Sequence, residues 1–183
     1  MKKKSIILSI IIFILSYQIG LTQQNKSWIR KSGDILQIAL PVAALGSTYF
    51  YQSDDKPHWQ FLKAYAFSML ETQILKRLVV KQRPDGSDNL SFPSGHTASA
   101  FSGASFLQIC YGWKVGWPAY LLASWVGYSR IYAHKHDIWD VLGGASISIL
   151  NSLIFVKKYR SKNNNLSLVR YQHYFLVSYR ISF

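Results

Sequence analysis

The chain has 183 residues, about the length of one domain. Its formal net charge is +13 at pH 7, and 49% of its residues are hydrophobic while only 16% are charged, below the roughly 25% usual for soluble domains. An aromatic content of 15% excludes a disordered chain, and the lone Cys110 excludes a scaffold of intrachain disulfides. The composition therefore points toward a membrane.

Residues 1–22 have the layout of a secretory signal. Lys2–Lys4 form a basic segment, Ile6–Leu15 form a short apolar segment, and the small residues expected at a cleavage site follow at Gly20 and Thr22. The alternative is an uncleaved first membrane helix over the same residues. In both cases the three lysines stay cytoplasmic and the remaining chain emerges on the far side of the membrane.

Apolar stretches alternate with short polar connections through residues 23–160, and we expect this segment to form one helical domain. The predicted fold is all-α, a compact antiparallel bundle of about five to six helices embedded in a membrane. Pro41 is expected to kink the first of these helices. The predicted helices of the domain are residues 35–51, 59–81, 96–110, 115–128 and 137–156.

Residues 161–183 form a basic and aromatic C-terminal tail in which loose alternation predicts one or two short strands. Such a tail could bind nucleic acid, since basic and aromatic residues contact phosphates and stack on bases. The favoured interpretation is a tail that lies against the lipid surface, without a nucleic-acid partner.

Alternating helix directions would place the connections at residues 52–58, 111–116 and 157 onward at one end of the bundle. The last of these is basic, as expected for the cytoplasmic side. The segments 83–93 and 130–136 would then lie at the opposite end. All residues with evident chemistry fall in or beside these two segments, so we expect a site that faces the periplasm.

Three motifs at that end have the residue types of a phosphate site. Lys76 and Arg83 are seven residues apart, which predicts one helix face two turns apart. Pro93–His96 opens a helix whose free N–H groups and dipole attract anions. His136 and Asp140 are four apart, so the carboxylate can accept the Nδ1 proton and leave Nε2 free as a nucleophile.

These motifs resemble the three-part signature of the superfamily of type 2 phosphatidic acid phosphatases and vanadium haloperoxidases. The matching positions are Lys76-x6-Arg83-Pro84, Pro93-Ser94-Gly95-His96 and Ser129-Arg130-x5-His136-x3-Asp140.

The resemblance implies a role for each residue. His136 would attack phosphorus and form a phosphohistidine, Asp140 would orient it, and His96 would protonate the leaving oxygen and then activate water. No metal or cofactor is implied, because cations take that place. The implied phosphate ligands are Lys76, Arg83, Ser94, Gly95 and Arg130.

The predicted function is hydrolysis of a lipid phosphate monoester or pyrophosphate at the outer face of a bacterial-type inner membrane, with membrane lipids as neighbours. A soluble exported acid phosphatase of the same superfamily is the first alternative, and a vanadium-dependent haloperoxidase is the second. A metal hydrolase would instead use His134, His136, Asp137 and Asp140, or Asp85 and Asp88. A membrane protein that keeps the site without activity is the last alternative.

Overall fold

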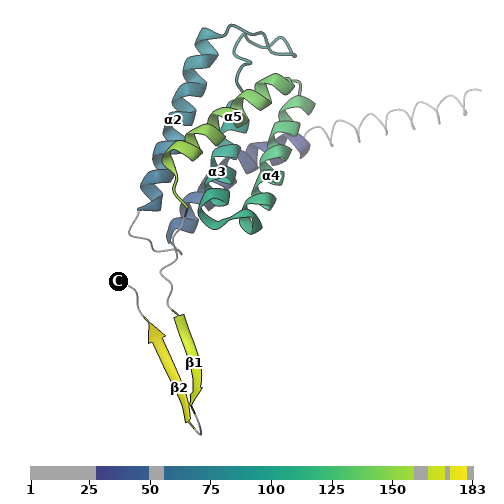
Figure 1. Cartoon of the computed structure of the whole chain (residues 1–183). Helices are drawn as coiled ribbons and strands as arrows, with labels where there is room; N and C mark the ends of the chain where they lie inside the picture. Colours follow the sequence, from purple (N-terminus) through teal and green to yellow (C-terminus); the bar gives the residue numbers. More distant parts are fainter. Residues whose placement is uncertain (1–27, 50–55, 159–164, 172–173, 181–183) are drawn as a thin grey trace, which may run out of the picture.

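Five helices pack side by side and alternate in direction in the part of the chain that the computed structural model describes, residues 28–49, 56–158, 165–171 and 174–180 (Figure 1). The prediction of an all-α antiparallel bundle is confirmed. The predicted signal segment, residues 1–22, lies outside the described residues. The elements are a helix over residues 28–49, α2 (Pro57–Leu78), α3 (Gly95–Tyr111), α4 (Trp113–Tyr132), α5 (Ile138–Phe155), β1 (Asn165–Tyr171) and β2 (Tyr174–Arg180).

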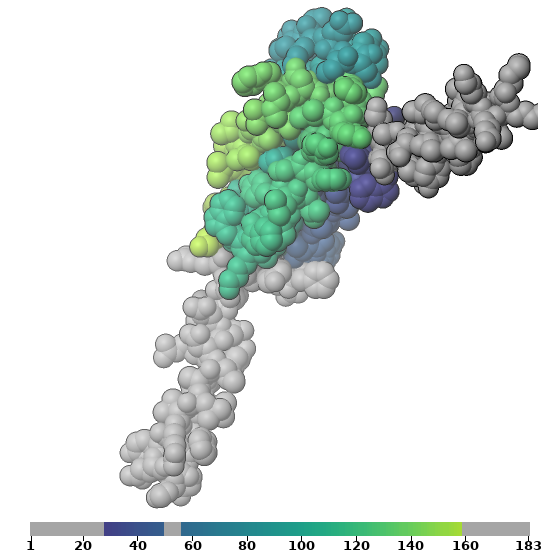
Figure 2. Space-filling model, turned by 90° about the vertical axis from the view of Figure 1, so that its right-hand side faces the viewer, coloured from purple at the N-terminus to yellow at the C-terminus, as the bar shows by residue number. Residues whose placement is uncertain are grey.

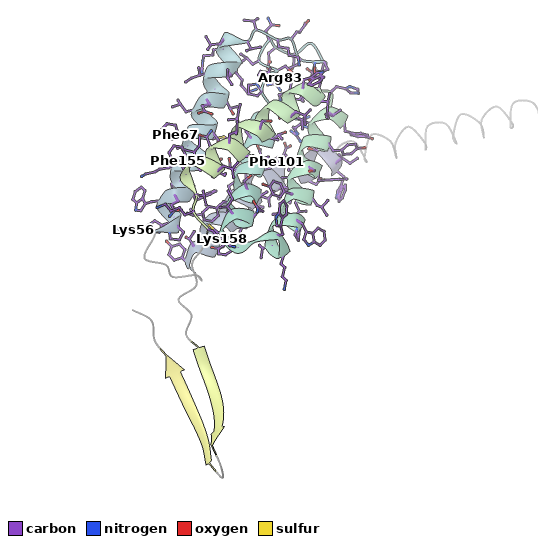
Figure 3. The ribbon with its side chains drawn as sticks, viewed as in Figure 1. Lys56, Phe67, Arg83, Phe101, Phe155 and Lys158 are labelled. Carbon is purple, nitrogen blue, oxygen red and sulfur yellow. The ribbon has the colours of Figure 1, made fainter. Side chains whose placement is uncertain are left out.

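The alternating directions bring the expected segments to common ends. Lys56 and Lys158 lie at one end of the bundle and Arg83 lies at the other (Figure 3). The connection between α2 and α3 and the turn between α4 and α5 therefore share the end that carries Arg83.

The end of α2 differs from the prediction. The helix stops at Leu78, and Val79 is already extended, with φ −97° and ψ 92°. The chain then pairs with itself, because the N–H of Lys81 donates to the carbonyl of Asn89 at 3.2 Å. Consecutive β-branched residues at 79 and 80 favour this extended backbone. Arg83 thus lies in a loop, and the expectation that it shares a helix face with Lys76 is wrong.

The helix α3 is the centre of the bundle. The helices α2, α4 and α5 all pack against it, and none of its large apolar side chains is exposed. Small residues allow this close packing, as the sequence predicts. A Cβ atom at Gly144 on α5 would lie only 2.4 Å from the carbonyl oxygen of Ser94, so glycine is what lets α5 approach the start of α3.

The first helix packs on α4 near the same end of the bundle. It is continuous through Pro41 and is already helical at residue 28, seven residues before the predicted start. A Cβ atom at Gly33 would lie 1.9 Å from Ser129 Oγ. The two helices are neighbours in the space-filling view (Figure 2), and Trp125 Nε1 donates to Ser32 Oγ at 3.0 Å.

The tail contains an antiparallel hairpin in which Asn165 pairs with Arg180 and Tyr171 with Tyr174. The expectation of short strands in this region is confirmed. The strands contact each other and not α2–α5, and they lie apart from the bundle (Figure 1).

The outer surface of the bundle carries many exposed large apolar side chains. Among the described helices, one is long and apolar enough to cross a membrane, Ile138–Phe155, with a mean hydropathy of 1.5. Examples of exposed apolar residues are Leu70 and Ile74 on α2, Leu121 and Leu122 on α4, and Leu150, Leu153 and Ile154 on α5.

Candidate active site

A cavity of about 190 Å³ lies at the end of the bundle that carries Arg83. It collects side chains from the first helix, the α2–α3 connection, α3, α4 and the α4–α5 turn. Four of the lining residues belong to the predicted site, and three do not. The lining residues are Arg83, His96, Arg130 and His136, together with Arg30, Asp34 and Lys135.

His136 and Asp140 form the pair that the spacing predicts, although His136 lies in the turn before α5. Its Nδ1 is 3.4 Å from Asp140 Oδ2. His136 is 3% exposed and Asp140 is fully buried. The helix begins with a capping box between Asp137 and Asp140. Because Asp140 belongs to the first turn of α5, the cap also fixes the direction of its carboxylate.

The imidazole of His136 is held neutral. Its pKa is lowered from 6.5 to about 4, mainly by burial and then by the positive charges of Lys76 and Arg83, against the opposing effect of Asp140. A neutral imidazole whose Nδ1–H is directed at a carboxylate presents the lone pair of Nε2. At pH 7 this residue therefore has the protonation state of a nucleophile.

The carboxylate of Asp34 contacts both His96 and Arg130. His96 Nε2 is 3.1 Å from Asp34 Oδ1, and Arg130 Nη1 donates to the same oxygen at 2.8 Å. The sequence prediction missed this residue, because it placed the first helix from residue 35 onward. The available signal was a single acidic residue directly before an uncharged apolar stretch.

Arg130 is 3% exposed and is held along its whole guanidinium group. Besides the bond to Asp34, Nε donates to Ser129 Oγ at 3.1 Å and Nη2 donates to the carbonyl of Arg30 at 2.9 Å. Its orientation is therefore fixed before any ligand arrives, which reduces the entropic cost of binding an anion.

The other two predicted cations are held less completely. Arg83 Nε donates to Asp88 Oδ1 at 2.7 Å, and its terminal nitrogens make no hydrogen bond within the described segments. Lys76 Nζ donates to the carbonyl of Leu90 at 2.8 Å and does not line the cavity, but its stem lies beside Gly95. The structure thus brings all three cations to one end of the bundle.

The hydroxyl of Ser94 is already hydrogen-bonded at the start of α3, where it accepts from the N–H of Thr97 as the helix cap. Ser94 is fully buried, its Oγ accepts from Thr97 Oγ1 at 3.0 Å, and its N–H donates to the carbonyl of Asp140 at 2.9 Å. Its hydroxyl is therefore a helix cap in this structure and does not line the cavity. Gly95 is the first residue of α3, next to Lys76.

The carboxylates that a metal hydrolase would use are paired with cations. Asp85 pairs with Lys135, Asp88 with Arg83, and Asp137 with Lys81. No group of three or more His, Cys, Asp or Glu side chains in the described ranges is arranged to hold a metal ion.

The fold and the site define a helical-bundle protein with a cavity at one end that is lined mainly by cationic and imidazole side chains. Residues 57–164 match the model of the PAP2 superfamily, and since this is more than half of the chain, the protein belongs to that superfamily.

Curated relatives resemble part of the chain. A lipid A 1-phosphatase of Porphyromonas gingivalis is 45% identical over 37% of the chain and 16% of its own length. A lipid A 4'-phosphatase of Helicobacter pylori is 35% identical over 47% of the chain and 43% of its own length. The undecaprenyl-diphosphatase BcrC of Bacillus subtilis is 34% identical over 37% of the chain and 34% of its own length. The chain thus spans less than half of each of these relatives.

Two crystal structures share the fold. LpxE of Aquifex aeolicus superposes with a TM-score of 0.61 at 24% identity, covering 70% of this chain and 83% of that one. A transmembrane PAP2-type phosphatidylglycerolphosphate phosphatase of Bacillus subtilis superposes with a TM-score of 0.57 at 27% identity, covering 72% of this chain and 73% of that one.

Proposed function

We propose that this protein is a metal-independent phosphatase that hydrolyses a phosphate monoester or pyrophosphate of a lipid. The observation that carries the proposal is a buried, neutral His136 that faces Asp140 through Nδ1 and lines a cavity shared with Arg83 and Arg130. Four cationic side chains and one carboxylate line the cavity. Such an excess of positive charge suits a phosphoryl group, whose charge in the transition state is spread over its equatorial oxygens.

The reaction has two steps. In the first, Nε2 of His136 forms a bond to phosphorus while the bond to the lipid oxygen breaks, and the imidazolium form of His96 gives its proton to that oxygen. Burial, and then the charge of Arg130, lower the pKa of His96 to about 4. The negative charge of a bound phosphate raises this pKa, so the proposal requires His96 to be protonated in the complex with the substrate. In the second, a water oxygen forms a bond to phosphorus, the P–N bond breaks, and His96 takes the proton of the water. Asp140 stabilises the positive charge that His136 carries between the two steps.

The cations bind the phosphoryl oxygens in this proposal. Arg130 is already fixed, and Arg83 has terminal nitrogens to offer. Lys76 approaches from α2, beside the N–H of Gly95 at the start of α3. The role of the Ser94 hydroxyl as a ligand stays a prediction, and it requires Oγ to turn from Thr97 toward the cavity.

A lipid substrate and a membrane location are supported by the surface. Leu121 and Leu153 are 60% and 63% exposed on the sides of the bundle, where lipid chains would cover them. Exposed tryptophans occur toward both ends, Trp139 at the start of α5 and Trp59 and Trp113 at the starts of α2 and α4. Such residues are enriched where a membrane meets water. The relatives named above are themselves lipid phosphatases by name.

The proposed orientation has the cavity facing the periplasm. Lys56, Lys157 and Lys158 lie toward the other end and form no ion pair within the described part of the chain, as expected for cytoplasmic lysines. The test uses single cysteines at Ser87 or Lys158 in a Cys110→Ser background, labelled in whole cells by a membrane-impermeant maleimide. Labelling at position 87 alone supports the orientation, and labelling at position 158 alone contradicts it.

The activity is tested on the full chain in detergent. Phosphate release is measured from phosphatidic acid, phosphatidylglycerophosphate, undecaprenyl pyrophosphate and lipid A, with and without EDTA or vanadate. We expect turnover of at least one lipid, unaffected by EDTA and inhibited by vanadate, which imitates the transition state. A His136→Ala variant should be inactive while keeping its unfolding temperature. Turnover that needs a divalent cation, or that survives His136→Ala, would contradict the proposal.

The location is tested by fractionation. An integral protein stays with the membranes after osmotic shock and alkaline washing, and it needs detergent for extraction. Release by osmotic shock alone would instead support the soluble exported acid phosphatase.

A further inference from the structure

Lys81 lies in the connection between α2 and α3 and is not one of the signature positions. Its Nζ is 2.7 Å from Asp140 Oδ1 and 2.6 Å from Asp137 Oδ2. The side chain of Lys81 is 31% exposed, whereas that of Asp140 is fully buried. A partly solvated ammonium group therefore reaches inward to a buried carboxylate.

The two oxygens of Asp140 have different partners. Oδ2 accepts from Ser91 Oγ and from the N–H of Asp137, and it faces His136 Nδ1. Within the described residues, Oδ1 has Lys81 as its hydrogen-bond partner. Loss of that partner would leave a buried carboxylate oxygen unsatisfied, which costs more than the bond itself contributes.

The backbone of the connection holds Lys81 in place. Its N–H donates to the carbonyl of Asn89 at 3.2 Å, and its carbonyl accepts from the N–H of Ser91 at 3.0 Å. The same short pairing therefore delivers two donors to Asp140, the ammonium of Lys81 and the hydroxyl of Ser91. Neither Lys81 nor Ser91 lines the cavity.

The two neighbouring carboxylates of Asp137 and Asp140 both pair with Lys81. Asp137 and Asp140 are three residues apart in the first turn of α5, and both carboxylates contact the same ammonium. Burial lowers the pKa of Lys81, but hydrogen bonds to Asp137 and Asp140 outweigh this and raise the pKa overall, so the group is charged at pH 7.

We propose that Lys81 is a positioning residue for catalysis, which holds the Asp140 carboxylate in the orientation that faces Nδ1 of His136. Lys81 touches no substrate and acts through Asp140. The inference rests on the proposed role of His136 as the nucleophile. It assigns a role to the α2–α3 connection beyond the phosphate ligand Arg83.

The test compares Lys81→Met, Lys81→Arg and the control Lys63→Met, an exposed lysine on α2 that is not among the residues lining the active-site cavity. Each full-length variant is assayed in detergent on dioctanoyl phosphatidic acid, or on the lipid that the wild-type protein hydrolyses. Outer-shell partners that orient metal ligands typically contribute about 10- to 100-fold, and we take the same range for a partner that orients a catalytic carboxylate. We expect Lys81→Met to lower kcat by that factor, with KM and the inhibition constant of the product phosphate within about twofold of wild type, because Lys76, Arg83 and Arg130 are intact. Inhibition by vanadate should weaken together with kcat, since vanadate imitates the transition state.

Lys81→Arg should recover most of kcat, because it restores a charged donor to Asp140, and Lys63→Met should match wild type. An unchanged kcat in Lys81→Met would overturn the inference. Parallel losses of kcat, phosphate binding and unfolding temperature would also overturn it, since they would indicate a general structural role.

If Lys81→Met does not fold, Lys81→Gln keeps a donor of similar length without the charge and replaces it in the comparison with Lys81→Arg. Activity that persists in His136→Ala would instead remove the proposed nucleophile. That result is read from a different variant, so the two failures are distinguishable.

Discussion

Asp34 and Arg130 are 96 residues apart in sequence and joined by a 2.8 Å contact between Oδ1 and Nη1. The same carboxylate oxygen lies 3.1 Å from His96 Nε2. The first helix thus supplies one anion that contacts both Arg130, a proposed phosphate ligand, and His96, the proposed proton donor. Since Asp34 is 40% exposed, its carboxylate is reachable from the cavity that it lines.

Replacement of Asp34 should therefore damage two functions together. In Asp34→Asn the side chain keeps its shape but loses the charge that Arg130 and His96 face. We expect kcat/KM to fall by about 10- to 100-fold, by analogy with other supporting residues, with the unfolding temperature close to wild type. The control is Ile38→Ala, an exposed residue one turn further along the same helix. Wild-type kcat/KM in Asp34→Asn would contradict this role.

The pKa of His136 should lie well below the usual value for a histidine side chain. Its pKa is lowered from 6.5 to about 4 by burial, then by Lys76 and Arg83. Nuclear magnetic resonance of histidine-labelled protein, with the signal assigned by its loss in His136→Asn, should give a midpoint below pH 5. In Lys76→Met the midpoint should rise, because one positive neighbour is removed. A wild-type midpoint near 6.5 would contradict the prediction.

The lowered pKa of His136 should also make the free energy of unfolding depend on pH. Only the unfolded chain takes up this proton between about pH 6.5 and pH 4, because the folded pKa is the lower one. The contribution of His136 to the free energy of unfolding is therefore complete above pH 6.5 and falls as the pH is lowered toward 4. A His136→Asn variant should lose this part of the pH dependence.

His96 should matter most for poor leaving groups. A general acid contributes little when the leaving oxygen is already stable as an anion, as in p-nitrophenyl phosphate. We expect His96→Ala to lower kcat/KM for phosphatidic acid by about 10²- to 10⁴-fold, with a clearly smaller loss of the phosphorylation rate with p-nitrophenyl phosphate. Rapid-quench measurement of phosphoenzyme separates this step from hydrolysis. Equal losses for both substrates would exclude His96 as the proton donor.

The sequence located His136 and Asp140 because their relationship is local. His136 lies directly before the N-cap residue Asp137, so the short segment that starts α5 is enough to bring its ring to the carboxylate of Asp140. His96 and Arg130 were predicted from their positions in the signature motifs. Such motifs indicate which residues take part but do not show how those residues are arranged in space. The cavity itself depends on how five chain segments meet, and their meeting at one end followed from alternating helix directions.

Asp34 and Lys81 could not be predicted in the same way. The contacts of Asp34 join residues 62 and 96 positions away, and no local spacing encodes them. Lys81 was assigned to a helix that in fact ends at Leu78. Tertiary pairing of the connection with itself decided that boundary, against a helical pattern that continues in the sequence.

Gly144 should be required for the geometry of the site, because it sets the distance between α5 and the start of α3. A Cβ atom there would lie 2.4 Å from the carbonyl oxygen of Ser94 and 3.2 Å from the N atom of Ala98, and neither backbone atom can move without shifting α3. Overpacking of this kind costs about 1–3 kcal/mol. Gly144→Ala should therefore lower the unfolding temperature, and it should lower kcat as well, since α3 carries His96 and α5 carries Asp140.

The matched control for Gly144→Ala is Gly46→Ala, because Gly46 is also helical and a Cβ atom there would meet nothing within 4 Å. Alanine in place of a helical glycine stabilises by about 0.5–1 kcal/mol when space is free. The two substitutions should thus move the unfolding temperature, measured in detergent by circular dichroism, in opposite directions. If Gly144→Ala were as stable and as active as Gly46→Ala, the close approach of α5 to Ser94 would not be what holds His96 and Asp140 in register.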